Sequence, residues 1–306
     1  PRGWLEWNDQ FRDGMRRFWV QGAASPNAAV EKGRRSDFAM RLCGSSDLYQ
    51  ARKRAPAESV NYVVSHDGFT LLDLLSYNQR NNRDNGEDNR DGHGNNLNFN
   101  CGAEGPSHAP TTKRMRARLQ RALLTTTLLA QGTPMLCAGD EFGHTQGGNN
   151  NPYCQDNAIT WLNWSAQDTD LLAFTQHVIA LRHRLLPFAN RWYSGIADAD
   201  GIYDLSWWNA DGSALQGDAW HHPTQRALSC LIGKPGRANS PLLLLINSGA
   251  IPVTFTLPRG QWHALLDTNH PRGLADWRAA GATPVPVVAH SLLLLQLTAA
   301  RPLARV

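Results

Sequence analysis

The chain has 306 residues, of which 42% are hydrophobic, and its formal net charge is +4. This composition describes a globular protein with apolar material for a large core and for two domains. No apolar run reaches membrane-spanning length and no signal-peptide pattern is present, so we predict a cytoplasmic protein without a membrane partner. Five cysteines without a CxxC pair favour reduced thiols over disulfides or a zinc site. We therefore expect neither a metal ion nor a cofactor.

The first residues predict a strand followed by a helix. Residues 4–7 form the strand candidate, and Asn8 or Asp9 can cap the helix that follows. One apolar helix face is predicted by Phe11, Met15, Phe18 and Trp19. Residues 22–54 predict loops with a short helix. Because the sequence enters its first strand at once and without Met, we expect it to start partway through a domain.

A second strand is predicted over residues 60–64, which are rich in Val and Tyr. It leads into His66 and Asp67, and Gly68 lets the chain turn away directly afterwards. In parallel α/β proteins, residues just past the carboxyl end of a strand line the ligand site. We therefore expect His66 and Asp67 to carry chemistry. The alternative is that Asp67 only caps the next helix and His66 is a core imidazole.

A long polar stretch runs from residue 78 to residue 110, after a predicted helical turn over residues 71–77. It is dense in asparagine: Asn78, Asn81, Asn82, Asn85, Asn89, Asn95, Asn96, Asn98 and Asn100. Amide side chains both donate and accept hydrogen bonds, which suits neutral, hydroxyl-rich ligands. A flexible surface loop explains the same composition equally well.

The clearest predicted helix spans residues 113–131. Its buried stripe is predicted to contain Met115, Leu119, Leu123 and Thr126. Its first half is basic, with Lys113, Arg114, Arg116, Arg118 and Arg121. A nucleic-acid-binding stripe is one interpretation, but no nucleic-acid motif accompanies the charge. A solvated outer face is the better one.

The next segment predicts a buried strand over residues 134–138 that ends near Asp140 and Glu141. A polar loop and another helix follow, with an apolar face of Phe174, Val178, Leu181 and Leu185, ended by Pro187. This third repetition of strand and helix predicts a parallel sheet with crossover helices. Three such units are too few to close a barrel of eight.

From residue 191 onward the pattern changes to short strands separated by Gly, Pro and Asn. The predicted strands cover residues 202–208, 227–232, 242–247, 253–257, 262–266 and 292–297. This pattern is typical of an antiparallel sandwich. We predict two domains, residues 1–188 and 189–306, and find no group of chemically active side chains in the second.

Several motifs resemble the α-amylase superfamily of glycoside hydrolases, and within it the isoamylase and glycogen debranching group. The motifs are NYVVSHDGFT at 61–70, GTPMLCAGDEFGH at 132–144, GNNNPYCQDN at 148–157 and TWLNW at 160–164. The asparagine-rich loop at 78–92 is also similar to that group. The resemblance implies a retaining hydrolase of α-1,6 linkages in branched α-glucans, namely glycogen, starch or limit dextrin. It also implies the C-terminal part of a (β/α)₈ barrel, with the last three βα units, followed by the sandwich.

The resemblance assigns roles to individual residues. Asp67 matches the carboxylate that stabilises the transition state, and His66 matches its sugar-binding neighbour. Further substrate-binding positions implied by the matching motifs are Asp140, Asn150, Tyr153 and Asp156. The motifs for the nucleophile and the acid/base residue have no counterpart here, and neighbouring Asp140 and Glu141 match a different position.

We therefore expect a debranching enzyme fragment that is inactive alone and has the missing N-terminal part of the enzyme as a partner. The alternative is a non-catalytic α-glucan-binding or scaffold fragment, suggested by the missing acids and the 11 tryptophans.

Overall fold

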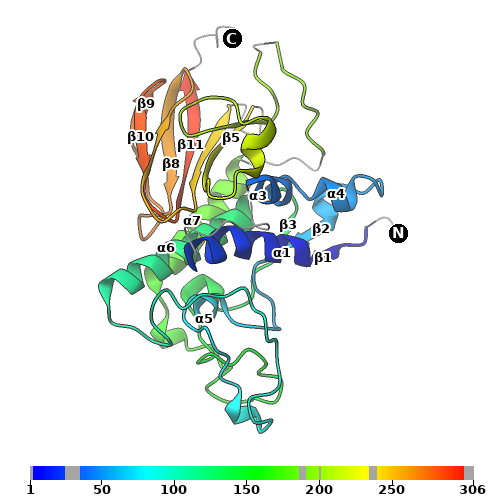
Figure 1. The fold of residues 1–306 in the computed structure, drawn as a ribbon, viewed down its shortest axis with the longest axis vertical. Coiled ribbons are helices and arrows are strands. Elements are labelled where there is room, and N and C mark those ends of the chain that lie inside the picture. The colour runs from blue at the N-terminus through cyan, green and yellow to red at the C-terminus, as the bar shows by residue number, and fades with distance from the viewer. Residues whose placement is uncertain (1–2, 25–34, 186–190, 200, 234–239, 300–306) are drawn as a thin grey trace.

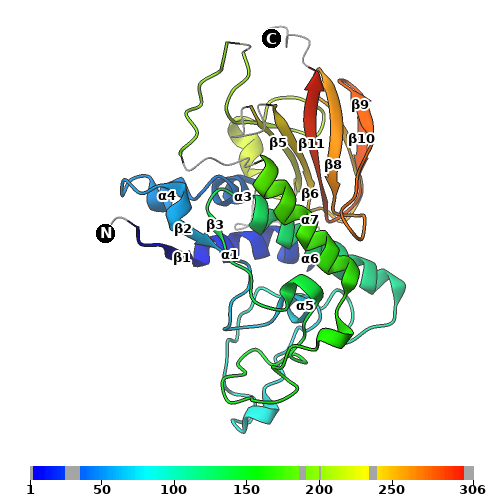
Figure 2. The ribbon, with the colours of Figure 1, turned by 180° about the vertical axis from the view of Figure 1, so that it is seen from behind.

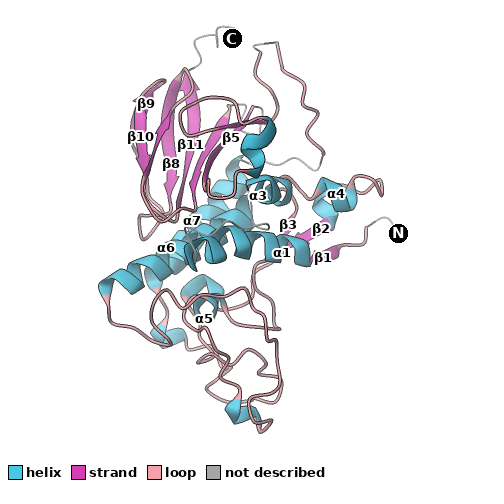
Figure 3. Cartoon of the chain, in the orientation of Figure 1, coloured by secondary structure: helices cyan, strands magenta, loops and turns pink. Residues whose placement is uncertain are grey.

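The computed structural model describes residues 3–24, 35–185, 191–199, 201–233 and 240–299 (Figure 1). Pro187, the expected helix stop, and the expected domain boundary at 188–189 lie outside these ranges. Figures 1 and 2 show the antiparallel strands at one end of the molecule, the long helices in the middle and a group of loops at the other end. Figure 3 shows that this loop end contains little regular structure.

The first sheet is parallel and has the order β1-β2-β3. Its strands are β1 (Glu6–Asn8), β2 (Ser59–Asn61) and β3 (Thr133–Pro134). Trp7 pairs with Val60, and Asn61 pairs with Pro134. The parallel arrangement is confirmed, but β2 and β3 are shorter than predicted; Pro134 has no N–H and removes one donor from the ladder. Within the described ranges the three strands do not close into a barrel.

The first helical segment lies against this sheet. It runs through α1 (Asp9–Arg16), the π-helical turn η1 (Arg17–Gln21) and α2 (Gly22–Ala24). Asn8 caps it, because its side-chain oxygen accepts from the backbone N–H of Phe11 at 2.9 Å. The predicted apolar face is confirmed, since Phe11, Met15, Phe18 and Trp19 are fully buried. The chain between β1 and β2 also contains α3 (Arg35–Leu42), α4 (Ser46–Tyr49) and the 3₁₀ turn η2 (Pro56–Glu58).

Two long helices form the middle layer, α6 (Pro110–Leu129) and α7 (Thr169–Leu185), which pack on each other. Short helical turns fill the loops around them: α5 (Leu71–Leu74), η3 (Arg83–Asn85), η4 (Asp140–Phe142) and η5 (Trp164–Ala166). Leu119, Leu123 and Thr126 are buried as predicted, whereas Met115 is only partly buried. Among the described residues, no helix has the length and apolar character needed to cross a membrane.

The basic half of α6 differs from the expected solvated face. Arg116 is buried and donates to the carbonyl oxygens of Asn100, Ala103 and Gly105. Arg121 is buried as well, and its Nε donates to the carbonyl oxygen of Thr268 at 2.6 Å. Burial lowers the pKa of Arg121 to about 10. The prediction of a solvated face is therefore wrong for these two residues, which instead satisfy backbone carbonyls of neighbouring loops.

The second half of the chain forms two antiparallel sheets, one with the order β4-β5-β6-β11-β8-β9 and one pairing β10 with β7. The larger sheet contains β4 (Ser206–Trp208), β5 (Ala227–Ile232), β6 (Leu242–Asn247), β8 (Gln261–Asp267), β9 (Arg278–Ala280) and β11 (Ser291–Ala299). The smaller one contains β7 (Val253–Thr256) and β10 (Pro284–Val287), and the 3₁₀ turn η6 (Gly217–His221) lies between β4 and β5.

The large sheet is buried on both faces. Because successive side chains of a strand point to opposite faces, Leu244 and Leu294 join the core that contains Phe174 of α7. Leu243 and Leu295 join a second core with Trp262 and the β7–β10 pair. The prediction of strands buried on both faces is confirmed. The helices and this sheet thus share one continuous core.

Candidate functional site

His66 and Asp67 lie in the loop that follows β2, beyond the carboxyl end of that strand. Their side chains are 73% and 64% exposed, and His66 Nε2 lies 3.6 Å from Asp67 Oδ1. Gly68 turns the chain at φ +100°, a conformation that glycine adopts without a steric penalty. The buried residues Val64 and Phe69 anchor both flanks of the turn. The pair is therefore held out into solvent by a fixed turn.

The alternative prediction for this pair is that Asp67 only caps the next helix and that His66 is a core imidazole. The structure contradicts both parts of it. The cap of α5 is Thr70, whose hydroxyl accepts from the backbone N–H of Asp73 at 3.1 Å. Asp67 therefore does not cap that helix. His66 is exposed, and its ring lies roughly perpendicular to that of Trp7, with ring centroids 5.8 Å apart. A core imidazole is likewise excluded.

Trp7 and Tyr62 provide an aromatic flank next to the pair. Their ring centroids are 5.5 Å apart, and Trp7 is 53% exposed while Tyr62 is buried. An exposed indole beside a carboxylate suits the mixed polar and apolar surface of a sugar ring. The sequence gives no sign that Trp7 belongs to the site, because only the pairing of β1 with β2 brings it next to His66.

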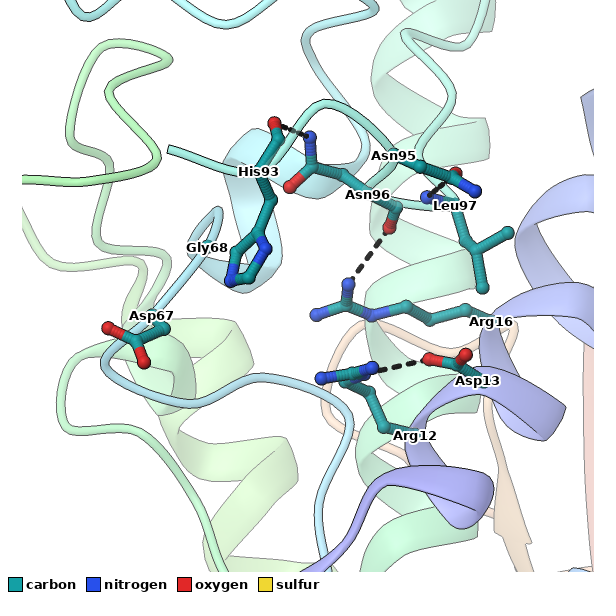
Figure 4. Close-up of a pocket in the computed structure, with 9 residues that line it drawn as sticks. All are labelled: Arg12, Asp13, Arg16, Asp67, Gly68, His93, Asn95, Asn96 and Leu97. Carbon is teal, nitrogen blue, oxygen red and sulfur yellow. Dashed lines mark hydrogen bonds and ion pairs between the residues drawn. The ribbon is translucent and has the colours of Figure 1, made fainter. Parts of the chain in front are cut away.

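A small pocket opens beside Asp67 (Figure 4). Its lining residues are Arg12, Asp13, Arg16, Asp67, Gly68, His93, Asn95, Asn96 and Leu97. In Figure 4 the His93 ring projects toward the guanidinium groups of Arg12 and Arg16, while the Asp67 carboxylate lies at the rim and points away from them. Arg12 Nε lies 2.8 Å from Asp13 Oδ1. The pocket thus offers hydrogen-bond donors next to a carboxylate that remains open to solvent.

Arg16 joins two walls of this pocket. It is buried, and it donates to the carbonyl oxygens of Val63 and Asn96, both at 2.8 Å. Burial lowers the pKa of Arg16 to about 10, which still leaves it charged at neutral pH. Its guanidinium group therefore fixes the loop after β2 against the asparagine-rich loop.

The asparagine-rich loop is ordered by contacts between its own amides and those of the loop at 144–157. Asn82 Nδ2 donates to Asn150 Oδ1 at 2.8 Å, and Asn82 Oδ1 accepts from the backbone N–H of Asn150 at 2.9 Å. Asn149 Nδ2 donates to Asn85 Oδ1 at 2.8 Å, and Asn85 Nδ2 donates to Asp91 Oδ2 at 2.7 Å. These amides are therefore occupied within the protein. The structure thus shows hydrogen bonds within the protein at Asn82, Asn85, Asn149 and Asn150.

Asp140 and Asn150, two of the expected substrate-binding residues, lie inside the protein. Asp140 is 3% exposed, and its Oδ1 accepts from the backbone N–H of Leu71 at 2.8 Å. Burial raises the pKa of Asp140 to about 7. The turn at Gly139, with φ +98° and His144 Cβ only 2.6 Å from where a Cβ would stand, directs the chain inward here. Asn150 is 1% exposed. Direct contact with a sugar is closed to both residues in this structure.

The other two expected positions are exposed. Tyr153 is 69% exposed. Asp156 Oδ1 accepts from Trp161 Nε1 at 3.0 Å, and the Trp161 side chain is itself 60% exposed. Trp164 is similarly open to solvent and packs on Phe142, with the two ring centroids 5.0 Å apart. In the sequence the two tryptophans stand out only as part of the TWLNW motif, because their exposure is visible only in the folded chain.

Two expectations about chemistry can be compared with the described residues. All five cysteines are free, in agreement with the prediction of reduced thiols. In the ranges that the structure describes, no group of three or more His, Cys, Asp or Glu side chains is arranged to hold a metal ion.

Comparisons with known proteins agree on one group of relatives. No protein-family model matches the chain. The glycogen debranching enzyme of Yersinia pestis bv. Antiqua (strain Angola) is 41% identical over 287 residues, which are 92% of this chain and 40% of the relative. The enzyme of Yersinia enterocolitica serotype O:8 / biotype 1B gives the same values. The chain is a partial homologue of glycogen debranching enzymes. It spans 40% of the length of the curated relatives it matches.

Solved structures similar to this chain include pullulanases. Pullulanase from Bacillus acidopullulyticus matches with a TM-score of 0.65 and 20% identity, covering 95% of this chain and 30% of that one. Pullulanase type I from Bacillus subtilis, solved with maltose, matches with a TM-score of 0.63 and 21% identity. The match covers 97% of this chain and 36% of the pullulanase chain. At this identity the likeness concerns the fold. The mixed α/β fold, with one parallel and one antiparallel sheet, is thus that of a part of pullulanase structures.

Proposed function

We propose that this chain is part of a glycogen-debranching glycoside hydrolase that cleaves α-1,6 linkages in branched α-glucans with retention. In this proposal residues 1–188 are the last three βα units of a (β/α)₈ barrel, and residues 189–306 are the appended sandwich. The 41% identity to debranching enzymes supports the activity. The free outer edges of β1 and β3, among the described strands, suit pairing with further barrel strands. The five free thiols suit a cytoplasmic location.

The role of Asp67 is to bind hydroxyl groups of the sugar at the cleavage site. Its exposed carboxylate beyond the end of a parallel strand is the observation that carries the proposal. As the sugar ring flattens toward an oxocarbenium ion, these hydrogen bonds strengthen, so the transition state is bound more tightly than the substrate. His66 adds a second hydrogen-bonding group beside it. Trp7 covers an apolar face of the sugar.

The nucleophile and the acid/base residue come from outside this sequence in our proposal. A retaining mechanism needs two carboxyl groups about 5 Å apart across the glycosidic bond. Asp140 and Glu141 do not meet this requirement, since Asp140 is buried and Glu141 accepts from the backbone N–H of Gly139 at 2.8 Å. Asp67 therefore works together with acids supplied by the rest of the enzyme.

Complementation tests this proposal. The chain is mixed with the preceding part of a homologous debranching enzyme, and the release of linear chains from glycogen is measured. We expect activity that falls about 10²–10³-fold in Asp67→Asn, the loss typical for one preorganised electrostatic contact. The control is Asp88→Asn, which changes an 87% exposed carboxylate and leaves the rate unchanged. No activity in a well-folded complex, or full activity of Asp67→Asn, contradicts the proposal.

A second candidate function is α-glucan binding without catalysis. It is favoured by the exposed aromatic side chains Tyr153, Trp161 and Trp164, which are 69%, 60% and 62% exposed. Such side chains stack on sugar rings. Co-sedimentation of the isolated chain with glycogen supports this function if binding is retained in Asp67→Asn and lost in Trp161→Ala. Absence of binding to any α-glucan removes it.

A further inference from the structure

Asn150 lies where three segments of the site meet. Its backbone carbonyl oxygen accepts from the N–H of Gly68 at 3.0 Å, directly after Asp67. Its side chain donates to the carbonyl oxygen of His93 at 2.9 Å and to Asn96 Oδ1 at 3.1 Å. Its Oδ1 accepts from Asn82, as described above. One buried residue therefore connects the two segments: its backbone carbonyl oxygen binds the Asp67 turn, and its side-chain amide binds the segment that carries His93.

The segment at 93–97 forms the wall of the pocket opposite the Asp67 turn, and it is fixed from two sides. The carbonyl oxygen of His93 accepts from both Asn150 Nδ2 and Asn96 Nδ2. The carbonyl oxygen of Asn96 accepts from Arg16 on α1. Removing the Asn150 side chain takes away its two hydrogen bonds to this segment and leaves the bond from Arg16 on α1 and the two bonds within the segment. The position of His93 relative to Asp67 thus depends on Asn150.

Space around this amide is closely matched to its size. A Cβ built on Gly92 stands 2.3 Å from Asn150 Oδ1 and 2.7 Å from Asn82 Nδ2. Gly92 also has φ +75°, which side chains rarely adopt. The chain approaches the amide pair this closely because residue 92 has no side chain. The contact is therefore tightly packed as well as hydrogen-bonded.

We propose that Asn150 is a positioning residue that fixes the Asp67 turn and the His93 wall of the pocket relative to each other. It acts through Gly68 and His93 and does not touch the sugar, since it is buried. A site is efficient when the groups that contact the ligand are held by such a supporting layer. The inference rests on the proposed function in one respect, that the pocket receives an α-glucan. The arrangement of the two walls can be tested without any ligand.

Amide hydrogen exchange of the chain tests the arrangement directly. Asn150→Ala removes the side-chain bonds to His93, Asn96 and Asn82 but keeps the backbone carbonyl oxygen that accepts from Gly68. Exchange is therefore expected to rise about 5- to 30-fold in residues 93–97, which lose bonds directly, and to rise in residues 66–69 because the backbone of residue 150 loses the side-chain bonds that hold it. The matched control is Asn85→Ala, which also removes amide bonds between the two loops but has no contact with residues 68, 93 or 96. Equal exchange in these segments for both variants, or no change in Asn150→Ala, overturns the proposal.

Asn150→Asp keeps the test valid if the alanine variant does not fold. Its carboxylate still accepts from Asn82, but its second oxygen faces two acceptors, the His93 carbonyl oxygen and Asn96 Oδ1. Asp91, whose Oδ2 lies 3.5 Å from Asn82 Nδ2, adds like charge, while Arg16 on Asn96 and Arg80 on Gly92 are cations bound to the same loop. A protonated side chain donates again, so exchange relative to wild type is expected to recover as pH falls. An exchange ratio that stays constant with pH overturns the positioning role.

Ligand affinity separates this proposal from the proposed function. Maltotetraose binding is measured by calorimetry for the wild-type chain and for both alanine variants. We expect Asn150→Ala to weaken binding about 10-fold, while Asn85→Ala leaves it unchanged. If the wild-type chain binds no maltotetraose, glucan binding by this chain alone is contradicted and the exchange experiment still decides the positioning role. If wild type and Asn150→Ala bind equally, the positioning role is overturned and glucan binding stands.

Discussion

The two ends of the molecule are held together by different forces. In the antiparallel sheet, every residue of β5 and β6 is buried, and leucines fill both faces. At the loop end, the chain from residue 78 to residue 100 has few buried apolar residues, and amide side chains bind each other and the backbone. Hydrophobic burial does not depend on direction, whereas hydrogen bonds must be matched one by one. The sheet therefore supplies stability, and the loop end supplies precise placement.

Buried ionisable groups show the same contrast. At the loop end Asp73 is fully buried, and its carboxylate accepts from the backbone N–H groups of Gln146 and Gly148 at 2.8 and 3.3 Å. In the sheet region His290 is buried beside the carbonyl oxygen of Ser248, 3.2 Å from its Nδ1. An acid is buried at one end and a base at the other. The two ends should therefore respond to pH with opposite signs.

The largest expected effect is the loss of a sheet core side chain. Leu244→Ala leaves a cavity between the sheet and the helices, and should lower the free energy of unfolding by about 2–5 kcal/mol. Urea denaturation followed by circular dichroism measures this. Leu274→Ala is the control, because Leu274 is 56% exposed and its loss should cost about 0.5 kcal/mol or less. A loss below about 1 kcal/mol for Leu244→Ala would contradict a core shared by the helices and the sheet.

The second prediction concerns Asp140 at the loop end. Because burial raises its pKa to about 7, the folded chain holds a proton between pH 4 and pH 7 that the unfolded chain has released. This group therefore makes stability fall as pH rises through that range, by up to about 1.4 kcal/mol for each pH unit. Asp140→Asn keeps an acceptor for the N–H of Leu71. The variant should be more stable than wild type by a few kcal/mol at pH 8 and similar to it at pH 4.

Urea denaturation of both proteins at pH 4.5, 6 and 8 measures this difference. Stabilities that differ by a constant amount at all three values would show that the Asp140 carboxyl group is not the origin of the slope. The same variant should bind maltotetraose as wild type does, because the side chain is buried. A loss of affinity would restore the sequence-based expectation that Asp140 contacts the sugar.

His290 should give a smaller effect of opposite sign. Burial lowers its pKa to about 4, so the unfolded chain binds a proton between pH 6.5 and pH 4 that the folded chain does not bind. Its contribution to stability therefore rises with pH in this range. His290 has φ +55°, which asparagine tolerates, so His290→Asn is a suitable variant. The free energy of unfolding of the variant, relative to that of wild type, should increase by about 1–3 kcal/mol between pH 7 and pH 4.5. If the variant loses as much stability as wild type on acidification, buried His290 is not the origin of this pH dependence.

The smallest expected effect is local to the loop end. The Thr145 hydroxyl donates to Asp73 Oδ1 at 2.5 Å. Thr145→Val removes this donor and should lower the free energy of unfolding by about 1–2 kcal/mol, since a buried carboxylate loses one partner. Thr145→Ser keeps the hydroxyl and should cost less. Hydrogen exchange at residues 145–148 follows the change, and equal behaviour of the two variants would show that the hydroxyl is not needed.

The sequence predicted what depends on local periodicity. The spacing of Phe11, Met15 and Phe18 fixes one face of a helix, and all three are buried. The alternation of strands and helices predicted the parallel sheet, and short apolar runs predicted β4, β5, β6, β7, β8 and β11 but not the short strands β9 and β10. Periodicity reports which face is apolar, and burial follows from it.

The sequence did not predict contacts between distant polar groups. Nothing near Asn82 indicates that its partner is Asn150, and nothing near Arg116 indicates that three carbonyl oxygens lie within its reach. Composition therefore suggested a ligand-binding or flexible loop, and charge suggested a solvated helix face. Such partners are set by how the chain folds back on itself, so only the folded structure reveals them.

The position of a bound α-glucan tests the account most directly. A crystal structure of the chain with maltotetraose, or intermolecular NMR contacts in solution, gives this position. We predict a glucose unit whose hydroxyl groups lie within hydrogen-bond distance of the Asp67 carboxylate, next to His66 and Trp7. A sugar bound elsewhere on the chain, with the Asp67 carboxylate still facing only solvent, would contradict it.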